Sequence, residues 1–138
     1  MGEKDFTICG VKVVVDKVGE KTVVRLKADD RMKIDERGLI YGGYTFCLAD
    51  YANMLTVRSQ HPTSFLLNAH VKYVAPVVVG QEMVAEAELL GKEGRYYRVR
   101  VVVKTDRVVF EGEFTDIALD KHVLDVRGRR EIRTRQNL

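Results

Sequence analysis

The sequence predicts an α+β domain in which an antiparallel sheet of about six strands wraps around one long central helix. Two patterns predict this fold: apolar and polar residues alternate with period two along most of the chain, and one segment, 42–58, departs from that alternation. A chain of 138 residues that is 46% hydrophobic can bury a core without stabilising disulfides or metals, and it has no room for a second domain. We therefore expect one domain over residues 1–120, followed by a basic tail over 121–138.

Six segments alternate or run apolar at strand length, and we expect each of them to be a strand. They are residues 11–18, 21–28, 64–74, 82–90, 95–104 and 107–119. The third segment is expected to place Phe65, Leu67, Ala69, Val71 and Tyr73 on one face and Asn68, His70 and Lys72 on the other. The separators VGEK, LGKEG and TD have hairpin length, so the strands should pair antiparallel with one dry face and one wet face.

The segment from Gly42 to about Arg58 contains no Gly or Pro after its opening pair and is rich in Ala, Leu and Met, which favours a helix. That helix would be about 25 Å long. Its surface is apolar nearly all round, interrupted chiefly by Asp50 and Asn53, so it must be covered on every side. A sheet curled around such a helix is the arrangement called the hotdog. One sheet of this size cannot enclose the helix, so we expect a homodimer or a dimer of dimers.

The net charge of +3 lies entirely in the tail. Residues 1–120 hold 17 Lys and Arg against 18 Asp and Glu, whereas residues 121–138 hold six against two. The body is therefore not expected to bind nucleic acid. No apolar run is long enough for a membrane span, and the charged start does not resemble a signal peptide, so we expect a cytoplasmic protein. Three Asn and three Gln beside plentiful Glu, Lys, Arg and Val are typical of a thermophile.

Cys9 and Cys47 stand far apart without a CxxC spacing, so neither a zinc site nor a disulfide framework is indicated, and Cys47 is expected to be a small core residue. The three histidines fall in different predicted elements, which argues against a metal site. GxSxG, P-loop, GxGxxG and HExxH motifs are absent, so the residues of serine hydrolases, phosphate-binding loops and zinc proteases are lacking. We expect no metal and no cofactor.

Asp50 is the first candidate for chemistry, because a carboxylate in the middle of an apolar helix is costly to desolvate. It either caps or pairs with a buried Arg or Lys, or acts as a base or nucleophile with a tuned pKa. Gly42 and Gly43 at the helix start favour the second interpretation. Glycine lets a substrate approach the backbone, and the free N–H groups of a first helical turn can stabilise an oxyanion. A donor and an acid together indicate acyl transfer.

The segment YGGYTFCLADYA, residues 41–52, resembles the HGG...LAD signature of hotdog thioesterases similar to the PaaI-type acyl-CoA thioesterases of phenylacetic acid degradation. The resemblance extends over about residues 31–119. DERGLIYGG at 35–43 is similar to the family pattern Asn-x-x-Gly-x-x-His-Gly-Gly, and VKYVAPVVVGQEMVAEAELL resembles the strand, Pro and Gly run downstream. The resemblance implies hydrolysis of an acyl-CoA, or another acyl thioester, to free acid and thiol.

The resemblance also implies residue roles. Asp50 would activate water, or attack, at the thioester carbonyl. The Gly42 amide would donate a hydrogen bond to the carbonyl oxygen, and Gly43 would help to bind the substrate. In such enzymes the site lies at a dimer interface, so Gly42 and Asp50 of one site would come from different subunits. Two positions depart from the pattern: Tyr41 replaces His and Asp35 replaces Asn. A tyrosine hydroxyl still donates a hydrogen bond, whereas an ionised Asp35 nearby would raise the pKa of Asp50.

Several alternatives stay open at the level of sequence. Asn53, three residues beyond Asp50, either orients water or the acyl group, or bonds a strand-edge backbone group. Aromatic and Met residues of the helix either line an acyl tunnel or form plain core, and the basic tail either meets CoA phosphates or is a solvated end or an oligomer contact. The main alternative function is a non-catalytic protein that binds or senses acyl-CoA or an acyl carrier. A hotdog dehydratase is disfavoured because no His stands near the glycine pair.

Overall fold

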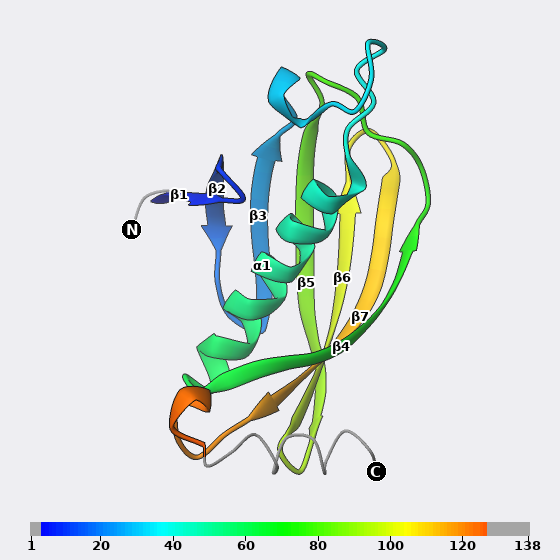
Figure 1. The fold of residues 1–138 in the computed structure, drawn as a ribbon. Helices are drawn as coiled ribbons and strands as arrows, with labels where there is room; N and C mark the ends of the chain where they lie inside the picture. The colour runs from blue at the N-terminus through cyan, green and yellow to red at the C-terminus, as the bar shows by residue number, and fades with distance from the viewer. Residues whose placement is uncertain (1–3, 127–138) are drawn as a thin grey trace.

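The computed structural model describes residues 4–126 and shows one antiparallel sheet with one long helix on its inner face (Figure 1). The strands are β1 (Lys4–Ile8), β2 (Val11–Lys17), β3 (Lys21–Lys27), β4 (Ser64–Tyr73), β5 (Glu82–Glu93), β6 (Tyr96–Lys104) and β7 (Val108–Ala118). The helix is α1 (Gly42–Gln60), and two short 3-10 helices are η1 (Asp30–Met32) and η2 (Val123–Asp125). The order of strands in the sheet is β1-β2-β3-β5-β6-β7-β4.

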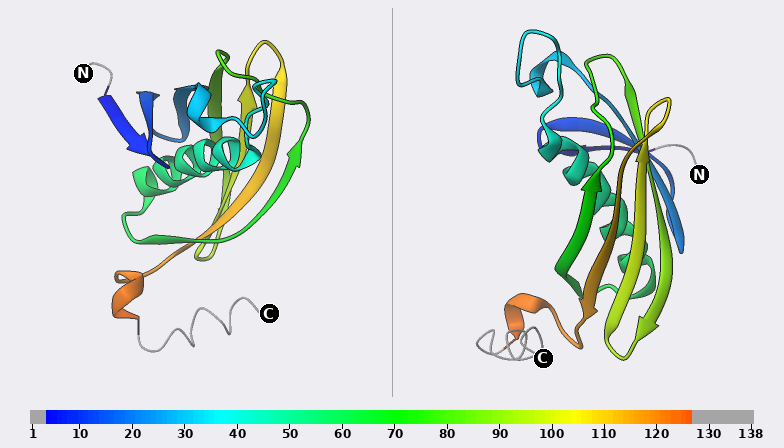
Figure 2. Two further views of the ribbon diagram at one scale, coloured as in Figure 1. Left: turned by 45° about the horizontal axis from the view of Figure 1, so that its top comes forward. Right: turned by 90° about the vertical axis from the view of Figure 1, so that its right-hand side faces the viewer.

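The predicted architecture is confirmed, because α1 lies in the hollow of the curled sheet, as in the hotdog fold (Figure 2). Six strands correspond to the six predicted segments, and the helix ends two residues later than expected. The seventh strand, β1, was not predicted. It is five residues long and pairs with β2 from Lys4 opposite Val15 to Ile8 opposite Val11. Five residues are too few for an alternating pattern to stand out from a charged chain start.

The strand β4 differs from expectation in which side chains face the core. Its pairing with β7 shifts register between Leu66 and Asn68, and such a bulge interrupts the alternation of faces. Leu66 and Ala69 therefore pack against the core, whereas Phe65 is 40% exposed. The prediction that Phe65 and Ala69 share one face is wrong, because the extra residue at Leu67 reverses the pattern on one side of it.

The core lies between the inner face of the sheet and one side of α1. Met83, Ala85 and Ala87 of β5 and Val99, Val101 and Val103 of β6 are buried, as their period-two pattern predicted. On α1 the buried apolar residues are Leu48, Ala49, Ala52 and Val57, and the half-buried ones include Tyr44, Phe46, Tyr51, Met54 and Leu55. A single chain thus leaves apolar surface on the far side of α1, where a second copy was predicted to lie.

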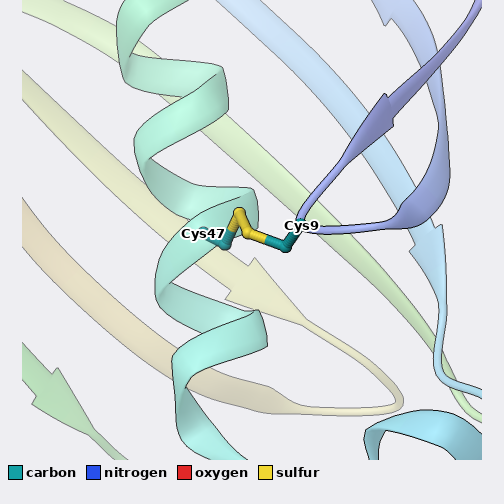
Figure 3. The surroundings of a disulfide bond; sticks show 2 residues. All are labelled: Cys9 and Cys47. Atoms are coloured by element: carbon teal, nitrogen blue, oxygen red, sulfur yellow. A yellow bond between two sulfur atoms is a disulfide. The ribbon is translucent and has the colours of Figure 1, made fainter.

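The two cysteines form a disulfide, with the sulfur atoms 2.07 Å apart (Figure 3). Cys9 lies in the turn between β1 and β2, where it and Gly10 both have positive φ angles, as tight hairpin turns require. Cys47 lies on α1. The sequence interpretation, in which no disulfide was indicated and Cys47 was a plain core residue, is wrong. The hairpin brings Cys9 over the helix across 38 residues of sequence, and cysteine spacing alone carries no sign of that contact.

Over residues 4–126 the structure contains no helix long and apolar enough to cross a membrane. Most of the predicted basic tail lies outside the described residues, so the predicted roles of its arginines stay predictions.

Candidate functional site

The helix α1 begins where two aromatic rings leave no room for a side chain. A Cβ on Gly43 would lie 2.5 Å from Cε2 of Tyr41, and a Cβ on Gly42 would lie 2.9 Å from Cε2 of Tyr73. The Tyr73 hydroxyl donates a hydrogen bond to the carbonyl oxygen of Gly42 at 2.9 Å. Tyr41 precedes the helix in an extended conformation and gives it no side-chain cap. The glycine pair therefore lets both rings lie against the helix start. Tyr44 N–H donates to the carbonyl of Tyr41 at 3.1 Å, whereas a helix supplies no carbonyl acceptor for the N–H groups of Gly42 and Gly43 before it.

A pocket of about 310 Å³ opens beside this first turn. Its lining is mostly apolar and combines the helix start with the segment between β4 and β5: Ile40, Gly42, Thr45, Tyr73, Val74, Ala75, Pro76, Val77 and Val109. A mostly apolar pocket beside a helix start can accept a group with an apolar body and a polar end.

The middle of α1 carries the second part of the site. Asn53 is fully buried, and its Nδ2 donates to Oδ1 of Asp50 at 3.3 Å and to Oδ1 of Asp116 at 2.9 Å. Asp116 lies on β7 and is only 3% exposed, whereas Asp50 is half-buried. The Asn53 amide thus bridges two carboxyl groups, one from the helix and one from the sheet.

Burial changes the acidity of both carboxyl groups. It raises the pKa of Asp50, and the hydrogen bond from Asn53 opposes part of that rise. Burial also raises the pKa of Asp116 to about 6; the bond from Asn53 and the charge of Arg58 lower it, while the charge of Asp50 raises it. Among the described residues no cation pairs with Asp50. The cap or cation pair that would make Asp50 purely structural is therefore not found there.

The structure sorts the sequence-predicted residues into two groups. Tyr41, Gly42 and Gly43 lie together at the start of α1, and Asp50 and Asn53 lie together at its middle. Asp35 belongs to neither group. Its Oδ1 accepts hydrogen bonds from the backbone N–H groups of Arg37 at 3.0 Å and Leu39 at 3.2 Å, so it shapes the loop before the helix.

Asp116 is the residue that sequence reasoning missed. It occupies a position of β7 that alternation assigns to the buried face, in line with Phe110 and Phe114. A carboxylate at a core position of a strand was the available signal, and it is the same signal that singled out Asp50 on the helix.

The two parts of the site are too far apart to act on one carbonyl group within one chain. Asp50 lies eight positions after Gly42, which corresponds to about 12 Å along a helix. Hydrogen-bond contacts span only about 3 Å. Within residues 4–126 no group of three or more His, Cys, Asp or Glu side chains is placed to hold a metal ion.

A family model described as the Thioesterase superfamily matches residues 37–110, which are 74 of the 138 residues. Methylthioribose-1-phosphate isomerase of Aquifex aeolicus is 42% identical over 97 residues, which make up 70% of this chain and 21% of that protein. Transcription factor FapR of a Thermoanaerobacter species is 28% identical over 130 residues, 91% of this chain and 64% of that protein. The chain thus spans a fifth to just under two thirds of these curated relatives.

Solved structures share the fold. The uncharacterized protein PH1136 of Pyrococcus horikoshii is 40% identical with a TM-score of 0.72, covering 89% of this chain and 87% of that one. A point mutant of the phenylacetic acid degradation protein PaaI of Thermus thermophilus is 24% identical with a TM-score of 0.72, covering 78% and 93%. A hypothetical thioesterase of Streptococcus pneumoniae, solved with coenzyme A, is 19% identical with a TM-score of 0.73, covering 80% and 88%. At 24% and 19% identity, the likeness to the PaaI mutant and to the hypothetical thioesterase shows a shared fold alone.

Proposed function

Because the chain belongs to the Thioesterase superfamily, we propose that it hydrolyses an acyl thioester, with acyl-CoA as the first substrate to test, to free acid and thiol. The observation that carries this proposal is Asp50, a half-buried carboxyl in mid-helix whose pKa is raised by burial and whose described partner is the neutral Asn53 amide. A raised pKa makes the ionised carboxylate a stronger base, as activation of water requires.

In the proposed reaction the Asp50 carboxylate takes a proton from water while the water oxygen attacks the thioester carbonyl. The carbonyl oxygen becomes an oxyanion, which the N–H of Gly42 stabilises at the start of the helix. The tetrahedral intermediate then collapses, the carbon–sulfur bond breaks, and the thiolate takes the proton back from Asp50 to leave as a thiol. Direct attack by Asp50 on the carbonyl is the alternative route, with hydrolysis of the resulting anhydride by water.

We propose that one complete site needs two subunits, in a homodimer or a dimer of dimers. The separation of about 12 Å between Gly42 and Asp50 along α1 supports this, as does the half-buried apolar surface on the far side of that helix. In such a site Gly42 of one subunit faces Asp50 of its partner. The pocket of about 310 Å³ beside Gly42 would take the apolar part of the substrate.

The flanking residues receive supporting roles in this proposal. The Tyr41 hydroxyl stands where the related pattern has a His and would donate to the substrate; its side chain is 59% exposed beside the glycine pair. Gly43 keeps the backbone open there, and Asn53 holds Asp50. Asp35 would contribute through the loop that it shapes. Location in the cytoplasm stays a prediction.

A non-catalytic protein that binds or senses acyl-CoA is the second candidate. It is favoured by the similarity to transcription factor FapR, which extends over 91% of this chain, and by Tyr41 in the position of the pattern's His. Such a protein would keep the apolar pocket and the glycine pair but would not release thiol.

Thiol release from short, long and aromatic acyl-CoAs separates these two functions. We expect the parent protein to release thiol from at least one class, and Asp50→Asn to reduce that turnover by at least about 100-fold, because a positioned base contributes that much. The Asn variant keeps the shape of the side chain, and circular dichroism and light scattering check that it folds and assembles. Tight acyl-CoA binding without thiol release by the parent would favour the sensing function instead.

A further inference from the structure

The proposed reaction leaves one buried ionisable group unused, the carboxyl of Asp116. It lies on β7, 63 residues from Asn53 in sequence, and it accepts a hydrogen bond from the Asn53 amide. Burial of an ionisable carboxyl costs free energy, which a hydrogen bond from a neutral amide offsets only in part. Asp116 is therefore a candidate for a role that depends on Asp50.

Both N–H groups of the Asn53 amide are committed to these two acids. Its two N–H bonds are used by Asp50 and Asp116, and the reverse orientation would place the amide oxygen against two carboxyl groups and repel them when they are ionised. The Asn53 oxygen is buried and has no hydrogen-bond partner among the described residues. The side chain of Asn53 is thus held by the two carboxyl groups, and rotation of the amide would disturb both.

We propose that Asp116 is a positioning acid of the site, which through the Asn53 amide fixes the orientation of Asp50 and, when ionised, makes Asp50 a stronger base. This inference rests on the proposed hydrolytic function. Asp116 does not touch the substrate in this arrangement, because its side chain is buried and bound to Asn53.

The groups around Asp116 define how its charge acts. From α1 it faces Asn53, the Asp50 carboxyl and the charge of Arg58. In the sheet its register partners are Tyr97 of β6 and Leu66 of β4. Asp50 is therefore the acid that senses the ionisation of Asp116, and Arg58 is the cation that partly offsets it.

The direction of the effect follows from the pKa of Asp116 near 6. Below pH 6 Asp116 is neutral and exerts no charge on Asp50. Above pH 6 its negative charge repels the negative charge of ionised Asp50 and raises the affinity of Asp50 for a proton, so the base becomes stronger. The turnover rate should therefore increase as the pH rises through about 6 and Asp116 becomes ionised.

The test compares Asp116→Asn with the parent over pH 5 to 8. Asn has the same shape as neutral Asp and still accepts a hydrogen bond from Asn53, so the variant imitates the low-pH state. We expect kcat about threefold to tenfold lower at pH 8, no difference at pH 5, and little change in KM. The matched control is Asp106→Asn, which removes an exposed carboxyl in the turn between β6 and β7 and should match the parent throughout. An equal loss at every pH would mean a structural role and would overturn the proposal.

A second measurement is independent of activity. Carbon-13 labelling of the aspartate carboxyl groups allows each to be titrated by NMR in the intact protein. We expect the Asp50 resonance to show a second inflection near pH 6 that is absent in Asp116→Asn, and the Asp116 midpoint to fall in Asp50→Asn. An Asp50 resonance that does not shift while Asp116 titrates would overturn the proposal. Coupled resonances in a protein that releases no thiol would instead uphold the linked pair and reject hydrolysis.

Discussion

At the scale of single residues, the proposed chemistry depends on two carboxyl groups in apolar surroundings, and only one of them was singled out from the sequence. Asp50 stood out because the helix around it is apolar on every side. Asp116 sits at a core position of β7, but the alternating pattern there also contains Gly112, so the acid did not stand out. Its proximity to Asn53 arises from packing of the sheet on the helix, which no local pattern encodes.

The raised pKa of Asp116 makes a prediction for stability. In the folded chain the pKa is about 6, above its ordinary value of 3.8, so between these values the folded state keeps a proton that the unfolded state has lost. Stability therefore falls as pH rises from about 4 to about 6 and does not change further above that. The full effect is about 3 kcal/mol for a shift of this size.

Asp116→Asn should remove this dependence. Between pH 4 and pH 7 the parent should lose up to about 3 kcal/mol of unfolding free energy that the variant keeps. The variant should therefore gain stability relative to the parent as the pH rises. Urea unfolding at both pH values and equal protein concentration measures it, with Asp106→Asn as the control that should show no such trend. A difference between variant and parent that stays constant with pH would contradict the raised pKa.

At the scale of elements, the sequence predicted every long strand and the helix, because each shows its periodicity over nine residues or more or lies between clear turns. The exceptions have local physical causes. LGKEG was taken as a separator, yet Leu90, Gly91 and Lys92 continue β5 after a register shift at Leu89, and the turn itself is at Gly94. A bulge of this kind depends on how the strand pairs with its neighbour. It therefore cannot be predicted from the sequence of one strand.

The disulfide between Cys9 and Cys47 ties the first hairpin to the helix that carries Asp50. It closes a loop of 38 residues, and in the chain-entropy model such a crosslink stabilises the fold by about 4 kcal/mol through the unfolded state.

Replacement of Cys9 and Cys47 by Ser should therefore lower the free energy of unfolding by about 4 kcal/mol while leaving kcat nearly unchanged, because neither sulfur belongs to the proposed reacting groups. Urea unfolding of the parent with and without a reducing agent gives the same comparison, and the double variant serves as the control because reductant should not affect it. Equal stability of the reduced and oxidised parent would show that the crosslink contributes nothing.

At the scale of the whole molecule, the fold explains why one chain covers only part of the helix α1. One curled sheet buries one side of α1, and the half-buried aromatic residues lie on the same helix as both halves of the site. The sequence predicted the second copy from the apolar helix, and the helical distance between Gly42 and Asp50 gives the same expectation on independent grounds. Together they make assembly a condition of the proposed chemistry.

Two variants that each remove one half of the site make this condition testable. Asp50→Asn removes the base. Gly42→Pro removes the amide donor at a first-turn position where proline suits a helix, and Tyr41 before it already has an extended backbone, with φ −62° and ψ 126°. Because a Cβ at Gly42 would meet the Tyr73 ring, both variants also carry Tyr73→Ala, and Tyr73→Ala alone is the control.

The most direct test of the shared site mixes these two variants and lets their subunits exchange. In a mixed dimer one of the two sites receives an intact Gly42 from one chain and an intact Asp50 from the other. Since random exchange makes about half of the dimers mixed, we predict that thiol release returns to about a quarter of the rate of the Tyr73→Ala control. Mixed dimers that are verified by mass and remain as inactive as either variant alone would contradict the shared site.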